Sequence, residues 1–149
     1  MQYLVLWVRL FLGAHTLLSG LNHFFVFFPL PPVDLSPAGE FISIMTEVGL
    51  YDMIKVVEVL VGFFLVFNVF VPLALIAEFP ITLSIFWLNV FIDGQPRQLF
   101  TGNRELIFHV FLLAAYAGYY LEVLKFKAPL KELWSKERLH VNKMFGGNR

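Results

Sequence analysis

The chain has 149 residues, of which 58% are hydrophobic and only 15% are charged. Soluble domains are about 45–50% apolar and about 25% charged, so this composition predicts a protein surrounded largely by lipid. The formal net charge of zero at pH 7 gives no electrostatic attraction for nucleic acid, which is not expected as a partner, and the absence of Cys excludes disulfides, thiolate metal sites and iron–sulfur clusters carried by this chain.

The first apolar window, from Leu4 to Phe28, predicts a retained transmembrane helix. A helix needs about 20 apolar residues to cross the hydrocarbon core of a bilayer. The apolar part of a signal peptide is shorter, about 7–15 residues, and is preceded by basic residues. Here the only basic residue, Arg9, lies inside the window, so we do not interpret the window as a cleaved leader.

A short helix is expected on the membrane surface after this window, over residues 37–48. Ser36 is a typical N-cap, Pro37 is suited to the first helical position, and Gly49 is suited to the end of the helix. The apolar side chains of such a helix would contact the interfacial region of the bilayer.

Three further windows are apolar and long enough to be predicted as transmembrane helices: Met53 to Val71, Leu73 to Ile92 and Glu105 to Leu124. The first two are separated at Asn68 to Pro72, because Pro lacks an amide donor and disfavours the helical conformation of the residue before it. Helices joined by so short a turn are antiparallel neighbours. The link from Asp93 to Arg104 is rich in turn-forming residues and is expected to be a loop.

A polar tail follows the fourth window, over residues 126–149. The end of the chain carries most of its 11 Lys and Arg residues, namely Lys125, Lys127, Lys131, Lys136, Arg138, Lys143 and Arg149. The positive-inside rule predicts that such a segment is cytoplasmic. With four spans the N-terminus would be cytoplasmic too, in a bacterial inner (cytoplasmic) membrane.

The predicted fold class is therefore an all-α integral membrane protein. Residues 1–125 are expected to form a four-transmembrane-helix antiparallel bundle with the short interfacial helix in its first loop, and residues 126–149 a basic amphipathic tail. The lipid bilayer is the first expected partner.

Ionisable residues inside these windows indicate which helix faces point inward, because a charge facing lipid costs several kcal/mol. Antiparallel helices bring early residues of one helix beside late residues of the next. Arg9 in the first window and Glu78 in the third are thus expected at one depth near the cytoplasmic side. We predict that they form a structural ion pair.

A second group of polar residues is expected at one depth near the outer side. His23, Glu58 and His109 are the candidate catalytic cluster, since a histidine that titrates near neutral pH beside a carboxylate is suited to moving protons to or from a quinone carbonyl. The supporting polar cluster consists of Lys55, Asn89 and Glu105. A structural role is the alternative, because all six lie within about two turns of the interface, where water reduces the cost of a charge.

Two histidines and a carboxylate could also bind zinc or non-haem iron. No His-x-x-x-His or Glu-x-x-His pattern lies within a window, so we assign no metal ligands. His15 lies about 100° away from the inward stripe of the first window and is expected to be a packing residue.

Three runs of this sequence, VRLFLGAHTLLSGLNHFF, IKVVEVLVGFFLVFNVFVPLAL and FPITLSIFWLNVFIDG, resemble the DoxX-like family of small four-helix bacterial membrane proteins. The resemblance covers roughly residues 9–120. It implies inward polar positions at Arg9, His23, Lys55 and Glu58. Asn89 departs from the pattern, because relatives often have a histidine there.

The resemblance also suggests a function, since founding members of the family are similar to subunits of a thiosulfate:quinone oxidoreductase. It implies a quinone-facing or proton-handling subunit of a membrane redox complex, with quinone as the cofactor and other membrane proteins as partners. Such a chain would be an enzyme only as part of an oxidoreductase. Two alternatives stay open: a non-catalytic accessory subunit that docks onto a respiratory or photosynthetic complex, and a binder of a small lipophilic molecule.

Overall fold

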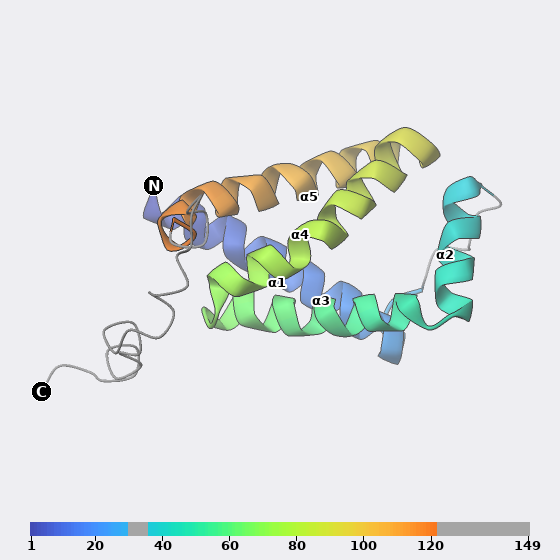
Figure 1. Cartoon of the computed structure of the whole chain (residues 1–149), viewed down its shortest axis with the longest axis horizontal. Coiled ribbons are helices and arrows are strands. Elements are labelled where there is room, and N and C mark those ends of the chain that lie inside the picture. Colours follow the sequence, from blue (N-terminus) through green and yellow to red (C-terminus); the bar gives the residue numbers. More distant parts are fainter. Residues whose placement is uncertain (30–35, 122–149) are drawn as a thin grey trace, which may run out of the picture. The chain divides into compact units, whose positions relative to one another are not determined.

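The fold is known from a computed structural model that describes residues 1–29 and 36–121. These residues contain no strand and form α1 (Gln2–Phe25), α2 (Pro37–Glu47), α3 (Leu50–Phe67), α4 (Val71–Trp87), the π-helix η1 (Leu88–Asp93), α5 (Pro96–Ala115) and the short 3₁₀ helix η2 (Ala117–Tyr119) (Figure 1). The chain divides into two compact units, Met1–Gly118 and Tyr119–Arg149, and the fold described below is that of the first unit.

The tightest packing in this unit is between α1 and α3, and it depends on glycines. A Cβ atom at Gly62 of α3 would lie 2.6 Å from the Leu17 Cα atom of α1, and one at Gly20 of α1 would lie 2.9 Å from the Lys55 carbonyl oxygen of α3. Gly13 meets Leu65 in the same way, at 2.8 Å. Small residues thus let the two backbones touch, as in membrane helix pairs.

The helices α4 and α5 complete the unit by packing on each other and on the first pair. A tight turn joins α3 to α4, with Asn68 and Phe70 both in the left-handed conformation, and α4 then continues through Pro80 into η1. The break predicted at residues 68–72 is confirmed. The buried core lies among α1, α3, α4 and α5 and consists of Val8, Leu12, Val61, Leu65, Val71, Ala74, Leu75 and Leu112.

The four-span prediction is wrong, because only two helices in the described residues are long and apolar enough to cross a membrane. They are Gln2–Phe25 and Val71–Asp93, the latter comprising α4 and η1. Only 33% and 28% of their apolar windows are buried inside the protein. Most of each window therefore faces outward, whereas the core helix of a soluble protein is mostly buried.

The other two long helices, α3 and α5, do not qualify as membrane spans, each for a different reason. The helix α3 begins at Leu50, three residues before the predicted start at Met53, and is only 18 residues long. Its full length therefore includes Asp52 besides Lys55 and Glu58, and three charges are too many for a membrane span of that length. The helix α5 begins at Pro96, well before the predicted start at Glu105, and ends at Ala115. It therefore includes the polar residues that we had interpreted as a loop.

Local capping signals explain where two of the helices begin. The Ser36 hydroxyl accepts a hydrogen bond from the Gly39 amide at 3.2 Å, so the predicted cap of α2 is confirmed. Pro96 occupies the first turn of α5 behind an extended Gln95, an arrangement that starts helices as readily as it makes turns. The predicted tail, residues 126–149, lies outside the described residues.

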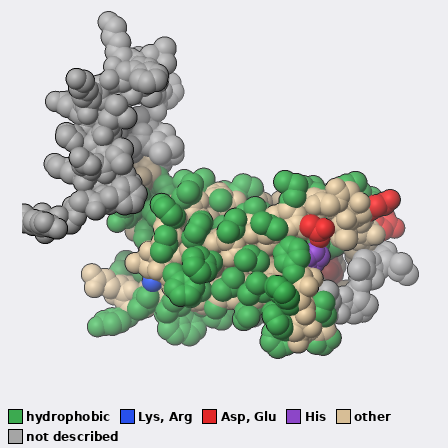
Figure 2. Space-filling view, turned by 90° about the horizontal axis from the view of Figure 1, so that it is seen from below, with side chains coloured by type: hydrophobic (Ala, Val, Ile, Leu, Met, Phe, Trp, Pro, Cys, Tyr) green, Lys and Arg blue, Asp and Glu red, His purple; other side chains and the backbone are tan. Residues whose placement is uncertain are grey.

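Hydrophobic side chains cover most of the described part of the face shown in Figure 2. Large apolar residues are exposed on every long helix, including Trp7 on α1, Phe67 on α3, Leu73 on α4 and Ile107 on α5. Exposed apolar surface of this extent indicates contact with lipid or with another protein.

We predict that Gly62→Ala forces α1 and α3 apart, because the new Cβ would overlap the backbone of Leu17. Overpacking of this kind costs about 1–3 kcal/mol or more, so the thermal unfolding midpoint of the purified protein in detergent should fall. Gly118→Ala is the matched control, since nothing lies within 4 Å of its Cβ position. Equal midpoints for the two variants would contradict the close contact.

Candidate functional site

A polar cavity of about 240 Å³ lies among the long helices of the first unit. All four contribute to it, together with η1. Its hydrogen-bonding side chains are His15, Thr16 and Ser19 from α1, Glu58 from α3, Glu78 and Thr82 from α4, Asn89 from η1, and Arg97, Gln98, Thr101 and Glu105 from α5. Three carboxyl groups in one cavity of a largely apolar protein make this the candidate site.

The carboxylate of Glu58 is neutralised by its neighbour on the same helix. The Lys55 Nζ atom lies 2.9 Å from both Glu58 oxygens and donates a further hydrogen bond to the Ser19 hydroxyl at 3.1 Å. Lys55 and Glu58 are 7% and 3% exposed. Each buried charge is thus matched and hydrogen-bonded, as a buried ion pair requires, and the link to Ser19 connects α3 to α1.

The carboxylate of Glu105 is also accompanied by cationic or titratable groups. The Arg104 Nη2 atom lies 3.4 Å from the Glu105 Oε1 atom, and the His15 Nδ1 atom lies 3.5 Å from the same oxygen. The side chain of His15 is 43% exposed, so this group connects the cavity to the surface. His15 therefore belongs to the site and is not merely the packing residue expected from the sequence.

Glu78 differs from the other two acids because it has no ion-pair partner. Its side chain is 4% exposed and lines the cavity, and its Oε2 atom is buried without any hydrogen-bond partner. The predicted ion pair with Arg9 is not formed. Arg9 donates instead to the Asn68 side chain in the turn between α3 and α4. Glu78 lies seven residues after the start of α4, which is about 10 Å further along the helix, so the two side chains are at different depths.

The structure does not bring together the three residues of the predicted catalytic cluster. His23 lies near the end of α1, where its Nε2 atom is 2.7 Å from the Asp52 Oδ1 atom. Of the three, only Glu58 lines the cavity. The prediction failed because depth along a helix does not specify which neighbour a side chain faces.

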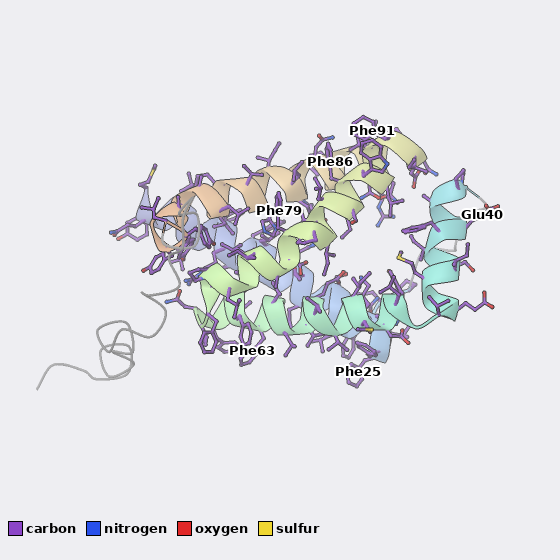
Figure 3. All side chains as sticks on the ribbon, viewed as in Figure 1. Phe25, Glu40, Phe63, Phe79, Phe86 and Phe91 are labelled. Carbon is purple, nitrogen blue, oxygen red and sulfur yellow. The ribbon has the colours of Figure 1, made fainter. Side chains whose placement is uncertain are left out.

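His109 is completely buried and holds α5 to α4 by two hydrogen bonds. Its Nε2 atom lies 2.9 Å from the Leu75 carbonyl oxygen, which can only accept, so Nε2 carries the proton. The Nδ1 atom then accepts from the Thr82 hydroxyl at 2.8 Å. Phe79, which is labelled in Figure 3, adds an edge contact to the His109 ring, with ring centroids 5.6 Å apart. These contacts give His109 a structural role beside the cavity wall.

The structure brings the residues of the predicted supporting cluster close to Glu58. Asn89 and Glu105 both line the cavity with Glu58, and Lys55 is bonded to Glu58. Sequence analysis missed the contribution of Thr16, Ser19, Gln98 and Thr101, because single hydroxyl and amide residues on a helix carry no signal of a site. In the described part of the chain, no three His, Asp or Glu side chains are grouped in a way that could hold a metal ion.

A second hollow, of about 570 Å³, lies between α2 and the end of α4 and is almost entirely apolar. Its lining residues are Pro37, Phe41, Leu83, Ser84, Trp87, Leu88 and Ile92. The only hydroxyl among them, that of Ser84, donates to the Pro80 carbonyl oxygen at 2.9 Å. No lining group of this hollow can exchange protons near neutral pH.

Comparison with protein-family models, with curated proteins and with solved structures gave no match for this chain.

We predict that Lys55→Met destabilises the protein by about 3–5 kcal/mol, because it leaves the Glu58 carboxylate buried without a counter-charge. The double variant Lys55→Met with Glu58→Met should recover much of that loss. Chemical unfolding of the three variants in detergent gives the coupling energy. If the double variant were as unstable as the sum of the two single ones, the pair would not be coupled.

Proposed function

We propose that this protein is DoxX-like and serves as a proton-handling, quinone-facing subunit of a membrane redox complex. The observation that carries the proposal is the buried carboxyl group of Glu78, which lines a polar cavity without a partner for its Oε2 atom. A carboxylate without a counter-charge in an apolar interior is unfavourable by several kcal/mol, so Glu78 needs a proton or a cation beside it. Such a group can exchange a proton when a nearby charge changes.

The neighbours of Glu78 offer a route for that proton. Glu105 shares the cavity and contacts His15, whose side chain reaches the surface. A histidine side chain can both accept and donate a proton, so it is suited to passing protons between a buried acid and water. The hydroxyls of Thr16 and Thr82, which line the same cavity, can relay hydrogen bonds between these groups.

The quinone part of the proposal is supported by the resemblance of the sequence to the DoxX-like family. Quinone chemistry moves protons together with electrons, which matches a cavity built around an acid. The chain has no Cys for an iron–sulfur cluster or a thiol relay. Electrons would therefore come from a bound cofactor, from the substrate or from a partner subunit.

We also propose that the protein resides in a bacterial inner membrane with both termini in the cytoplasm. Two helices long and apolar enough to span a membrane support a membrane location. The basic residues of the C-terminal sequence favour the cytoplasmic side for that end. In the first unit the start of α1 and the end of α5 lie at the same end of the helices (Figure 1).

An accessory, non-catalytic subunit is the second candidate, favoured by the exposed apolar residues on every long helix. Such a surface could dock onto a larger membrane complex. Under this alternative the cavity residues only stabilise the fold.

The first experiment is purification from the native source in a mild detergent, followed by identification of every copurifying protein and chromophore. The proposal expects a redox-active membrane protein together with a bound quinone. A partner without redox cofactors and without quinone would contradict the redox role and favour the accessory one.

We predict that Glu78→Gln lowers quinone turnover by the assembled complex about 100-fold and flattens its pH profile, because an amide cannot carry the proton. Glu40→Gln is the matched control, since Glu40 is an exposed acid on α2, away from the cavity (Figure 3). Turnover and proton uptake are measured per assembled complex. Full turnover in a normally assembled Glu78→Gln complex would leave the accessory role as the better explanation.

A further inference from the structure

The charges around the polar cavity do not balance at one position. Glu58 is matched by Lys55 at 2.9 Å, and Glu105 is accompanied by Arg104 at 3.4 Å. Glu78 has no such partner, and its side chain is only 4% exposed. One negative charge of the cavity is thus left to be neutralised from outside the chain.

Arg97 is the remaining cation that lines the cavity, and it does not fill this role. It lies on the exposed first turn of α5. Its guanidinium takes part in none of the ion pairs found among residues 1–29 and 36–121. Glu78 is therefore neutralised either by a proton or by a cation that enters the cavity.

The hydrogen-bonding side chains that line the cavity indicate the chemistry of such a group. The unsatisfied atom of Glu78 is an acceptor, and the side chains of Thr16 and Asn89 line the same cavity without a hydrogen bond to any other described residue. An ammonium group has one positive charge and three donors, and no acceptor. It can satisfy the carboxyl, the hydroxyl and the amide oxygen together.

The size of the cavity favours a small organic cation over a bare ion. A volume of about 240 Å³ leaves room for several carbon atoms besides the charged group. The described residues contain no group of three acidic or histidine side chains that could hold a metal ion. A multivalent cation would therefore lack the ligands that it needs.

We propose that the cavity binds a small molecule carrying one ammonium group, with Glu78 as its counter-charge and Thr16 and Asn89 as further acceptors. The inference goes beyond the redox function proposed above and shares with it only Glu78. Because the ammonium group takes the place of a proton at Glu78, binding and protonation exclude each other. The other titratable or charged groups that line the cavity or pair with its lining residues are Glu58, Lys55, Glu105, Arg104, Arg97, His15 and His109.

The test is isothermal titration calorimetry of the purified full-length protein in detergent with methylammonium chloride, at constant ionic strength. We expect saturable binding at one site per chain, with proton release seen as a dependence of the heat on the ionisation enthalpy of the buffer. Glu78→Gln should weaken binding at least about 30-fold, since it removes one partner of a buried charge pair. Glu40→Gln, outside the cavity, should bind as the wild type does.

Three calorimetric results would overturn the proposal: no saturable binding to the wild type, equal binding to Glu78→Gln, or binding of Na⁺ as tight as that of methylammonium. If the Glu78→Gln variant does not fold, a labelling experiment on the wild type tests the proposal instead. Dicyclohexylcarbodiimide modifies carboxyl groups in apolar surroundings, and mass spectrometry of the digested protein identifies the modified residue. Methylammonium should protect Glu78 from the reagent, and modification unchanged by methylammonium would also overturn the proposal.

The outcomes separate this inference from the redox function. If methylammonium does not bind but Glu78→Gln still abolishes proton-coupled quinone turnover, the ammonium site is absent and the redox role stands. If methylammonium binds through Glu78 but the variant retains full quinone turnover, the ammonium site stands and the redox role fails.

Discussion

The rest of the structure depends on the close contact between α1 and α3. At Gly13, Gly20 and Gly62 the two helices approach so closely that any Cβ atom would overlap the facing helix. This distance allows the Lys55 ammonium group to reach the Ser19 hydroxyl on the opposite helix while it holds Glu58. The contact therefore positions Lys55 and Glu58, so that the carboxylate of Glu58 at one wall of the polar cavity is paired with a cation.

Buried polar groups in this protein are of two kinds. Lys55 with Glu58, and His109 with Thr82 and the Leu75 carbonyl, are fully satisfied and hold pairs of helices together. The Arg9 Nε, Asp93 Oδ1, Arg104 Nε and Glu78 Oε2 atoms are buried without a hydrogen-bond partner among the described residues, and of these four residues only Glu78 lines the polar cavity. Since a satisfied network stabilises a fold and an unsatisfied buried acid does not, Glu78 is the place to look for function.

The apolar and the polar residues of the bundle are divided between its helices. The two helices long and apolar enough to span a membrane, α1 and α4 with η1, carry few charges, whereas α3 and α5 carry Lys55, Glu58, Arg104 and Glu105. Packing α3 against α1 and α5 against α4 turns those charges toward the interior. A cavity with three acids can thereby exist inside a chain whose exposed side chains are largely apolar.

By itself the sequence determined the features that depend on local chemistry. It placed a helix over the first 25 residues, the Ser36 cap of α2 and the break between α3 and α4, because capping, proline and apolar run length act within a few residues. Tertiary structure alone decided that Arg9 meets Asn68, that His23 meets Asp52, and that Glu78 has no ion-pair partner. These outcomes depend on the axial offset and rotation of packed helices, which many distant side chains set together, and no single helix sequence encodes them.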